Sequence, residues 1–368
     1  MFSEQDKSYM TRAIELAQQG QYTTTPNPNV GCVIVKNGRI IGEGFHQQAG
    51  ESHAEVHALR EAGTQARGAT VYVTLEPCSH FGKTPPCAKG LIDAGVNKVI
   101  AAMVDPNPQV AGRGLAMLKQ AGVETAFGLL EEQARALNDG FLKRMEFGLP
   151  FVSCKLAASV DGKTALSNGQ SKWITSSAAR RDVQIFRARS CAVLTGADTV
   201  LVDDAKMNVR DSECDISLPE GKQLRQPTRV IFDSQNRLSP NLPLFKIDSP
   251  VIILRTSLDN SHDWPHFVEQ VVVPDSKLKI NCHAALALLA QRGINRVWLE
   301  AGATLAGVFH QQTLIDEFVI YLAPKIIGHD GRGLFNTQTI ACMNDIATLN
   351  FTSVERIDED VRLILRPS

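Results

Sequence analysis

Three side chains that bind metals lie close together in the first quarter of the sequence, and they constrain the fold more than any other feature. His53 is followed about 25 residues later by Cys78, and Cys87 comes after a further eight intervening residues. One imidazole and two thiolates suit a tetrahedral zinc ion, and three protein ligands leave its fourth position open, as in catalytic sites. Zinc lowers the pKa of a bound water towards ~7, so a hydroxide nucleophile becomes available at neutral pH. The chain must therefore fold so that these three side chains meet.

Glu55 lies two residues after His53, where its carboxyl group is placed to transfer protons. His-x-Glu followed by Pro-Cys and a second Cys is the pattern of the zinc nucleobase deaminases. Ser52 and Glu55 also fit a capping box, in which a serine caps a helix and a glutamate follows three residues later. The capping box explains Glu55 without chemistry, but it explains neither His53 nor the cysteines. The sequence therefore predicts a metal site and leaves both roles of Glu55 open.

The spacing between the two cysteines is longer than the usual Cys-x-x-Cys. The intervening residues read Ser-His-Phe-Gly-Lys-Thr-Pro-Pro, and they must form a loop that returns Cys87 to the metal. Pro85 and Pro86 are suited to the start of the helix that follows, because proline fits a first helical turn. The same loop brings His80 and Lys83 beside the metal, where both are candidates for holding a substrate phosphate.

The length and composition indicate a globular chain of two domains. The chain has 368 residues, of which 43% are hydrophobic, enough for two cores. A net charge of −1 gives no overall attraction for nucleic acid or anionic membranes. No run reaches the ~20 apolar residues of a membrane span. The N-terminus lacks a secretory pattern, so we expect a cytoplasmic protein whose eight cysteines are thiols.

Hydrophobic periodicity predicts an α/β first domain. Helices are expected over 4–20, 53–62, 87–94, 113–121 and 131–145, with a hairpin over 30–44 that turns at Asn37-Gly38 and strands over 71–75 and 98–104. The strand over 71–75 leads to Cys78, so both halves of the metal site are predicted to meet at one edge of a sheet. Gly148 and Pro150 break the chain and divide it into a domain of residues 1–147 and one of residues 148–368.

The second domain is also predicted to be α/β. Strands are expected over 151–157, 191–195, 228–233, 251–255, 271–273, 296–300 and 318–326, and helices over 176–190, 283–292 and 304–312. Near Gly196 and Gly302 a strand runs into a turn and a helix, and free backbone N–H groups there can hold a phosphate. Neither turn is a Gly-x-Gly-x-x-Gly fingerprint, which argues against a Rossmann domain. Gly302 and Gly307 equally fit a purely structural role, in which they permit tight packing.

Several short motifs follow one another along nearly the whole chain. They are Pro26-Asn27-Pro28-Asn29-Val30-Gly31, His53-Ala54-Glu55, Thr74-Leu75-Glu76-Pro77-Cys78-Ser79-His80, Thr84-Pro85-Pro86-Cys87, Asp105-Pro106-Asn107-Pro108, Lys155-Leu156-Ala157, Asp161-Gly162-Lys163, Trp173-Ile174-Thr175 and Glu300-Ala301-Gly302. Their order and co-occurrence resemble the bifunctional pyrimidine deaminase/reductase family of riboflavin biosynthesis, which shares the long spacing between the cysteines. The resemblance implies a cytidine-deaminase-like three-layer αβα domain followed by a dihydrofolate-reductase-like α/β domain.

The resemblance implies two successive reactions. The first domain would be a hydrolase with one zinc ion that deaminates 2,5-diamino-6-ribosylamino-4(3H)-pyrimidinone 5′-phosphate, with Glu55 as the general acid and base. The second would be an NADPH-dependent oxidoreductase that delivers hydride to the ribose C1′ and gives 5-amino-6-(5-phosphoribitylamino)uracil. The implied partners are small pyrimidine ribotide phosphates, neither nucleic acid nor membrane, and the family implies a homo-oligomer, a dimer or a tetramer.

The resemblance also assigns the polar positions of both sites. His53, Cys78 and Cys87 are the implied zinc ligands, and Asn27, His46, His80 and Lys83 the implied substrate contacts of the deaminase. The implied cofactor contacts are Ala157, Trp173, Thr199, Asp203, Ser234, Gly302, Ala303, Thr304 and Leu305. The implied substrate contacts of the reductase are Lys155, Ser171, Arg187, Met207, Arg210 and Glu300. Guanidinium groups pair with phosphate bidentately, which suits Arg187 and Arg210, although helical arginines equally fit a solvated surface.

Two other interpretations of the chain stay open. One is a different cytidine- or tRNA-type zinc deaminase with an accessory nucleotide-binding domain, although nucleic-acid binders usually carry a Lys/Arg patch that the charge balance does not indicate. The other is a structural zinc module with no catalytic role. Structural zinc sites close with four protein ligands, and His57 is the nearest candidate for the fourth.

Overall fold

The computed structural model describes residues 2–79, 86–108, 110–171, 174–273 and 279–368, and the chain divides into two compact units. The first unit comprises Met1–Gly148 together with Ser217–Arg225, and the second comprises Leu149–Ile216 and Gln226–Ser368. The segment Ser217–Arg225 thus packs with the first unit, although it follows residue 148 in the chain. Within the described residues, no helix has both the length and the apolar character needed to cross a membrane.

A five-stranded sheet forms the centre of the first unit. Its order is β2 (Arg39–Phe45), β1 (Gly31–Lys36), β3 (Thr70–Val73), β4 (Lys98–Ala101) and β5 (Glu124–Phe127). β1 is antiparallel to β2 and β3, whereas β3, β4 and β5 are parallel. Asn37 and Gly38 both have positive φ, 52° and 73°, as the predicted two-residue hairpin turn requires.

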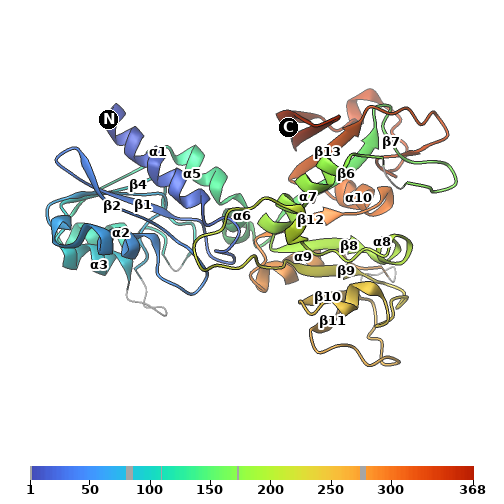
Figure 1. The fold of residues 1–368 in the computed structure, drawn as a ribbon, viewed down its shortest axis with the longest axis horizontal. Helices are drawn as coiled ribbons and strands as arrows, with labels where there is room; N and C mark the ends of the chain where they lie inside the picture. Colours follow the sequence, from blue (N-terminus) through green and yellow to red (C-terminus); the bar gives the residue numbers. More distant parts are fainter. Residues whose placement is uncertain (1, 80–85, 109, 172–173, 274–278) are drawn as a thin grey trace. The chain divides into compact units, whose positions relative to one another are not determined.

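Helices cover both faces of this sheet (Figure 1). One face carries α1 (Glu4–Gln18), α5 (Glu131–Leu137) and α6 (Asp139–Phe147), and the other α2 (Ala54–Ala62), α3 (Cys87–Ala94) and α4 (Arg113–Gln120). Because side chains alternate along a strand, Val33 and Val35 face the α1 core and Cys32 and Ile34 face the α2 core. The predicted three-layer αβα architecture is confirmed.

Two local predictions for this unit are wrong, and one strand was not predicted. The helix after residue 52 begins one residue later than a capping box requires: His53 is its N-cap, and no side chain makes a capping hydrogen bond there. The single helix expected over 131–145 is two helices, because Asn138 leaves the helical region with φ −127° and ψ 21°. The strand β5 was not predicted, since it is short and its burial does not alternate.

A nine-stranded sheet forms the centre of the second unit. Its order is β11 (Val268–Val272), β10 (Val251–Arg255), β9 (Thr228–Phe232), β8 (Ala192–Gly196), β12 (Arg296–Glu300), β6 (Phe151–Ser159), β13 (Glu317–Ala323), β16 (Asp360–Pro367) and β15 (Leu349–Ile357). The strands from β11 to β13 are parallel, and β16 and β15 are antiparallel. A separate two-stranded sheet pairs β7 (Lys163–Ala165) with β14 (Arg332–Gly333).

Four α-helices in the described part of the second unit accompany this sheet. Residues of α7 (Ser177–Arg189) and α8 (Ala197–Asp203) pack in one core, and residues of α9 (Cys282–Gln291) and α10 (Ala303–Gln311) in the other. The second unit also has the short 3-10 helices η2 (Asp211–Glu213), η3 (Pro243–Lys246) and η4 (Met343–Asp345), and the first unit has η1 (Gly63–Ala66). The strands β15 and β16 were not predicted from the sequence, because β15 is exposed along most of both faces and lacks a hydrophobic alternation.

The chain order creates a switch point in this sheet. The chain runs from β6 through α7 to β8, continues outward through β9, β10 and β11, and returns to place β12 between β8 and β6. Open α/β sheets bind ligands beyond the carboxyl ends of their strands at such a point. The ends of β8 and β12 are therefore where a nucleotide is expected.

Candidate active sites

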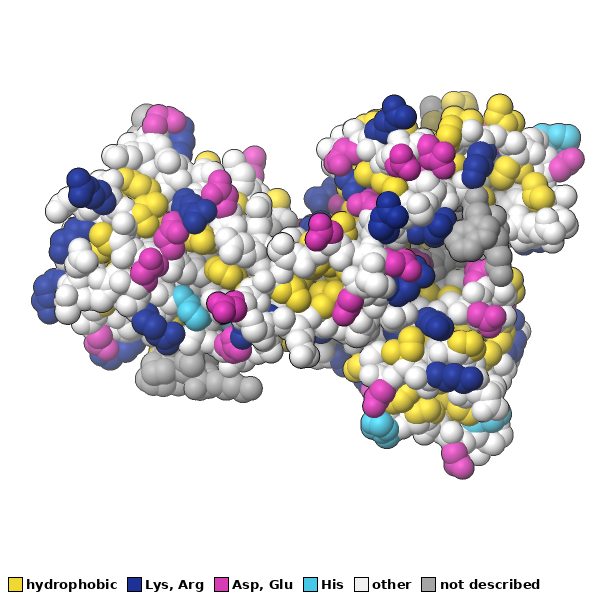
Figure 2. All heavy atoms as spheres, viewed as in Figure 1, with side chains coloured by type: hydrophobic (Ala, Val, Ile, Leu, Met, Phe, Trp, Pro, Cys, Tyr) yellow, Lys and Arg dark blue, Asp and Glu magenta, His cyan; other side chains and the backbone are white. Residues whose placement is uncertain are grey.

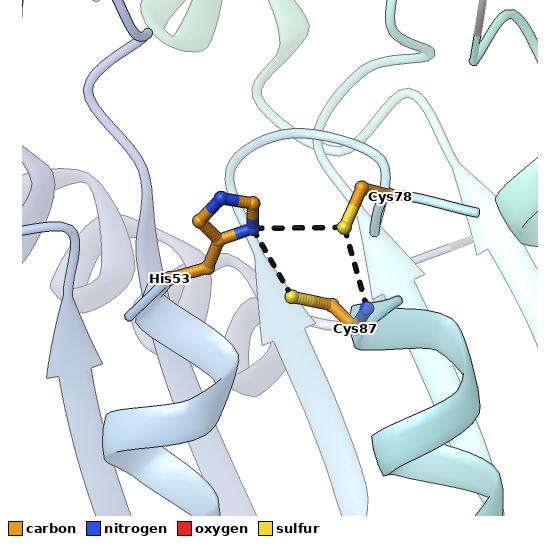
Figure 3. A group of neighbouring side chains, drawn as sticks. All are labelled: His53, Cys78 and Cys87. Carbon is orange, nitrogen blue, oxygen red and sulfur yellow. Dashed lines mark hydrogen bonds between the residues drawn. The ribbon is translucent and has the colours of Figure 1, made fainter. Parts of the chain in front are cut away.

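The three predicted metal ligands meet at one edge of the first sheet (Figure 3). His53 Nδ1 lies 3.3 Å from Cys87 Sγ and 3.6 Å from Cys78 Sγ, and all three ligand atoms lie within 4.8 Å of one another. Zinc–nitrogen and zinc–sulfur bonds are about 2.0–2.3 Å long, so one tetrahedral ion suits these separations. The donor set therefore fits zinc.

Local structure explains why these side chains converge. His53 has an extended backbone at the start of α2, Cys87 is the first residue of α3, and Cys78 follows β3. The backbone N–H of Cys87 donates to Cys78 Sγ at 3.3 Å. Hydrogen bonding from Cys87 lowers the pKa of Cys78 to about 4, so Cys78 readily supplies the thiolate that a metal requires.

Glu55 projects from the first turn of α2 and is only 3% exposed. Burial raises the pKa of its carboxyl group, and the charges of His53 and Cys78 act on it as well. A raised pKa suits a carboxyl group that both accepts and donates protons near neutral pH. The position of Glu55 in the helix is thus compatible with chemistry, whereas its predicted capping role is absent.

His57 does not join the metal ligands within the described part of the chain. The only group of three or more possible ligands found there is His53, Cys78 and Cys87. Burial lowers the pKa of His57, and its buried Nε2 has no hydrogen-bond partner. With three protein ligands among the described residues, the site fits catalytic zinc rather than structural zinc, which closes with four.

Asn27 and His46 form the adjoining wall of the site. Asn27 Nδ2 lies 3.0 Å from His46 Nε2, and His46 Nδ1 lies 3.0 Å from Ser52 O. The His46 ring stands edge-on to His53, with ring centroids 5.4 Å apart. Two predicted substrate contacts are therefore brought beside the metal ligands. The other two, His80 and Lys83, lie outside the described residues.

The second candidate site is centred on an ion pair between α7 and β12. Arg187 Nε lies 2.5 Å from Glu300 Oε1, Arg187 Nη2 lies 2.9 Å from Glu300 Oε2, and Arg187 Nη1 donates to Asn208 O at 2.8 Å. Both side chains are largely buried, with 13% and 14% exposed. Three of the five N–H groups of the Arg187 guanidinium thus donate to acceptors within the chain, and the contact of Arg187 with a substrate phosphate stays a prediction.

Lys155 lies beside Glu300 in the sheet, because β6 and β12 pair these two residues in register. Burial lowers the pKa of Lys155, and the Glu300 charge opposes that change. Burial alone would raise the pKa of Glu300, but Arg187 and Lys155 lower it to about 2. Trp298 Nε1 also donates to Glu300 Oε1 at 2.8 Å, a contact that the sequence analysis missed. The sequence could have predicted this contact, because Trp298 and Glu300 are two residues apart on a predicted strand and therefore share one face of it.

The predicted cofactor contacts Gly302 to Leu305 form the start of α10, with Gly302 as N-cap. A Cβ atom at Gly302 would meet nothing within 4 Å, whereas one at Gly307 would lie 2.3 Å from Asn336 O. The purely structural role therefore applies to Gly307 and not to Gly302. A Cβ at Gly196 would lie 3.6 Å from Leu305, so the turns that end β8 and β12 are adjacent.

The remaining predicted contacts of the reductase site are spread over several strands, helices and loops of the second unit. Thr199 and Asp203 are on α8, Ala157 is on β6, and Ser234 follows β9, where its carbonyl accepts a hydrogen bond from Thr256. Met207 is buried in the core below α7. Arg210 forms an exposed ion pair with Glu213 at 2.9 Å. Ser171 is exposed, and Trp173 lies outside the described residues.

Comparisons with known proteins agree on both halves of the chain. The family model for the cytidine and deoxycytidylate deaminase zinc-binding region matches residues 3–103, and that for the RibD C-terminal domain matches residues 150–363. Riboflavin biosynthesis protein RibD of Escherichia coli (strain K12) is 50% identical over 364 residues, which cover 98% of this chain and 99% of that protein. RibD of Haemophilus influenzae is 50% identical over 100% of this chain and 98% of its own length.

Solved structures give the same result. The structure of Acinetobacter baumannii RibD matches with a TM-score of 0.89 and 46% identity, over 99% of each chain. A diaminohydroxyphosphoribosylaminopyrimidine deaminase/5-amino-6-(5-phosphoribosylamino)uracil reductase from Thermotoga maritima matches with a TM-score of 0.86 and 35% identity, again over 99% of each chain.

Proposed function

The chain belongs to the RibD family of bifunctional riboflavin biosynthesis proteins, and from this premise we propose which residues carry its two reactions. It is a deaminase and a reductase, its substrate is a small pyrimidine ribotide, and its cofactors are zinc and NADPH. Family membership over the full length removes the alternatives of a tRNA-type deaminase and of a structural zinc module. On the face seen in Figure 2, basic and acidic side chains are interspersed.

The proposed substrate is 2,5-diamino-6-ribosylamino-4(3H)-pyrimidinone 5′-phosphate, and deamination precedes reduction. The name of the Thermotoga maritima relative supports this order, because it couples a deaminase for a diaminopyrimidine to a reductase for the corresponding uracil. We assign the deaminase to residues 1–147 and the reductase to residues 148–368. The two matched family regions, 3–103 and 150–363, support that division.

The convergence of His53, Cys78 and Cys87 beside the buried Glu55 is the observation that carries the proposed deaminase mechanism. A zinc ion held there supplies a water activated for attack at neutral pH. Glu55 would take one proton from that water and deliver it to the ring nitrogen. It would then carry a second proton, from the hydroxyl group now bonded to the ring carbon, to the amino group, which leaves as ammonia. Asn27 and His46 orient the pyrimidine from the adjoining wall, since their side chains already bond to each other.

The proposed reductase site lies where β6, β8 and β12 end. The free backbone N–H groups at the start of α10 bind the pyrophosphate of NADPH, since the open space at Gly302 permits close approach. Lys155 and Glu300, side by side in the sheet, face the ribityl-forming end of the substrate. In this arrangement Glu300 fixes the orientation of the Arg187 guanidinium group.

We also propose that the protein acts in the cytoplasm as a homo-oligomer. The thiolate ligands support the location, because reducing compartments preserve thiols and the chain's cysteines are free. The edge strand β15 supports self-association, because Phe351 and Val354 on it are 64% and 62% exposed. Sedimentation of the purified protein tests the second point, and a monomer at micromolar concentration would refute it.

A split assay on the purified protein tests the proposed function. Ammonia release from the diaminopyrimidine ribotide is followed first without cofactor, and oxidation of added NADPH is followed next. We expect ammonia release without NADPH and NADPH oxidation that depends on prior deamination. Ammonia release without any NADPH oxidation would refute the assignment of residues 148–368, and no ammonia from a zinc-loaded protein would refute that of residues 1–147.

A further inference from the structure

Asn138, at the junction of α5 and α6, binds the loop that carries Asn27. Its Oδ1 accepts a hydrogen bond from the backbone N–H of Asn29 at 2.7 Å, and its Nδ2 donates to Asn29 O at 2.8 Å. Asn29 Nδ2 donates in turn to Leu137 O at 3.2 Å. Three hydrogen bonds thus join the loop over residues 24–30 to a helix junction 109 residues further along the chain.

The side chain of Asn138 serves this loop rather than its own helix. Asn138 is the N-cap residue of α6, but its side chain makes no capping hydrogen bond there. It is only 5% exposed, so its amide is shielded from water and depends on Asn29 for its partners. The interruption between α5 and α6, which the hydrophobic pattern did not predict, is what turns this amide towards the loop.

The anchored loop continues directly into the deaminase site. Thr24 Oγ1 donates to Asn29 Oδ1 at 2.7 Å, and Asn27 N donates to Thr24 O at 2.8 Å, so the loop is closed on itself. The Asn27 side chain then reaches His46. The carbonyl of Ser52 can only accept, so His46 Nδ1 carries the proton and His46 Nε2 accepts from Asn27 Nδ2. Asn27 Oδ1 is thereby the acceptor that this amide offers to an amino group of a pyrimidine.

We propose that Asn138 is a positioning residue of the deaminase, which holds the loop over 24–30 so that Asn27 presents a fixed amide to the amino-substituted edge of the pyrimidine. The inference rests on the proposed role of Asn27 in substrate binding. A loop ordered before binding costs less conformational entropy when the ligand arrives. Removing the anchor therefore weakens substrate binding and leaves the chemical step at the metal largely unchanged.

The test is steady-state deaminase kinetics on full-length, zinc-loaded variants. Asn138→Ala removes both bonds to Asn29, and we expect KM for the ribotide to rise about tenfold with kcat within about twofold of wild type. Asn138→Asp keeps the acceptor but sets an oxygen against Asn29 O. Asn29→Ala removes both the bond to Leu137 O and the bond from Thr24 Oγ1, so both variants should raise KM. Gln133→Ala, which truncates an exposed amide on α5, is the matched control with unchanged KM.

The reductase reaction, zinc content and thermal unfolding of each variant separate positioning from folding. Loss of stability alone would reduce the active fraction, which lowers kcat and leaves KM unchanged, and that result would overturn the proposal. Unchanged KM in all three variants would overturn it as well. If Asn138→Ala does not fold, Asn138→Asp and Asn29→Ala decide. A wild-type protein without ammonia release would instead refute the proposed function itself.

Discussion

The two candidate sites differ in whether their polar side chains already bind each other or are arranged around a position for a ligand. In the first unit, His53, Cys78 and Cys87 come from one short stretch of chain, and their ligand atoms face one another around a position that suits an ion. In the second unit, Arg187 and Glu300 are 113 residues apart and satisfy each other. The first site is arranged to take up a metal, whereas in the second the largely buried Arg187 and Glu300 are already paired with each other. A local motif is therefore enough to specify the first, but only strand register and helix packing specify the second.

Replacing Glu55 with Gln should have the largest effect and should fall on one site only. The amide keeps the shape but cannot accept a proton, so we expect kcat for ammonia release to fall by about 10²–10⁴. Zinc content should be unchanged, because Glu55 is not among the ligand atoms. NADPH oxidation with the deaminated ribotide should also be unchanged. Deamination at the wild-type rate would contradict the role of Glu55.

Replacing Glu300 with Gln should lower the unfolding free energy of the second unit. The variant leaves the buried guanidinium of Arg187 without its counter-charge, and breaking one partner of a buried pair costs about 3 kcal/mol of unfolding free energy. Asp198→Asn is the matched control, because its pair with Arg237 is exposed and worth less than about 1 kcal/mol. Urea unfolding measures both values, and equal losses would show that the buried pair is not special.

The same pair should make stability depend on pH. Although burial opposes it, the charge of Arg187 holds the folded-state pKa of Glu300 near about 2, below the value of about 4.3 in an unfolded chain. The stabilisation is therefore fully present above about pH 5 and is lost as the pH falls towards about 2. The difference in unfolding free energy between wild type and Glu300→Gln should shrink between about pH 5 and pH 3. A constant difference would exclude this linkage.

Alanine substitutions at Gly302, the N-cap of α10, and at Gly307, inside α10, should distinguish a role in packing from a role in binding the cofactor. Alanine at position 307 would ordinarily favour a helix, but here its Cβ meets Asn336 O, so we expect a loss of about 1–3 kcal/mol in unfolding free energy. Alanine at position 302 meets open space with an ordinary φ of −69°, so a smaller loss is expected. Instead, Gly302→Ala should raise KM for NADPH. An unchanged KM would remove the phosphate-binding role of this turn.

Much of the first site could be predicted because its determinants are local. His53 begins a helix, Cys78 follows a buried strand, and Cys87 begins the next helix, so spacing and periodicity together define their meeting point. The break at Asn138 was not predictable in this way. The break coincides with a pair of hydrogen bonds from Asn138 to Asn29, which is remote in sequence, and the hydrophobic spacing of residues 131–145 carries no trace of them.

The second site was predictable in its strands but not in its contacts. Most strand positions followed from short apolar runs, and the turn at Gly302 followed from its place between a strand and a helix. The pairing of Arg187 with Glu300 depends on where α7 packs on the sheet, which no local pattern encodes. The C-terminal hairpin was missed because an exposed edge strand gives no alternation of burial.

The most direct test of the account is removal of zinc followed by separate measurement of the two reactions. Chelator-treated protein would be given the diaminopyrimidine ribotide, and in a parallel sample the deaminated ribotide with NADPH. If the two sites are organised independently, ammonia release is lost and returns with added zinc, whereas NADPH oxidation continues at the wild-type rate. Loss of both reactions, or ammonia release without metal, would contradict the account.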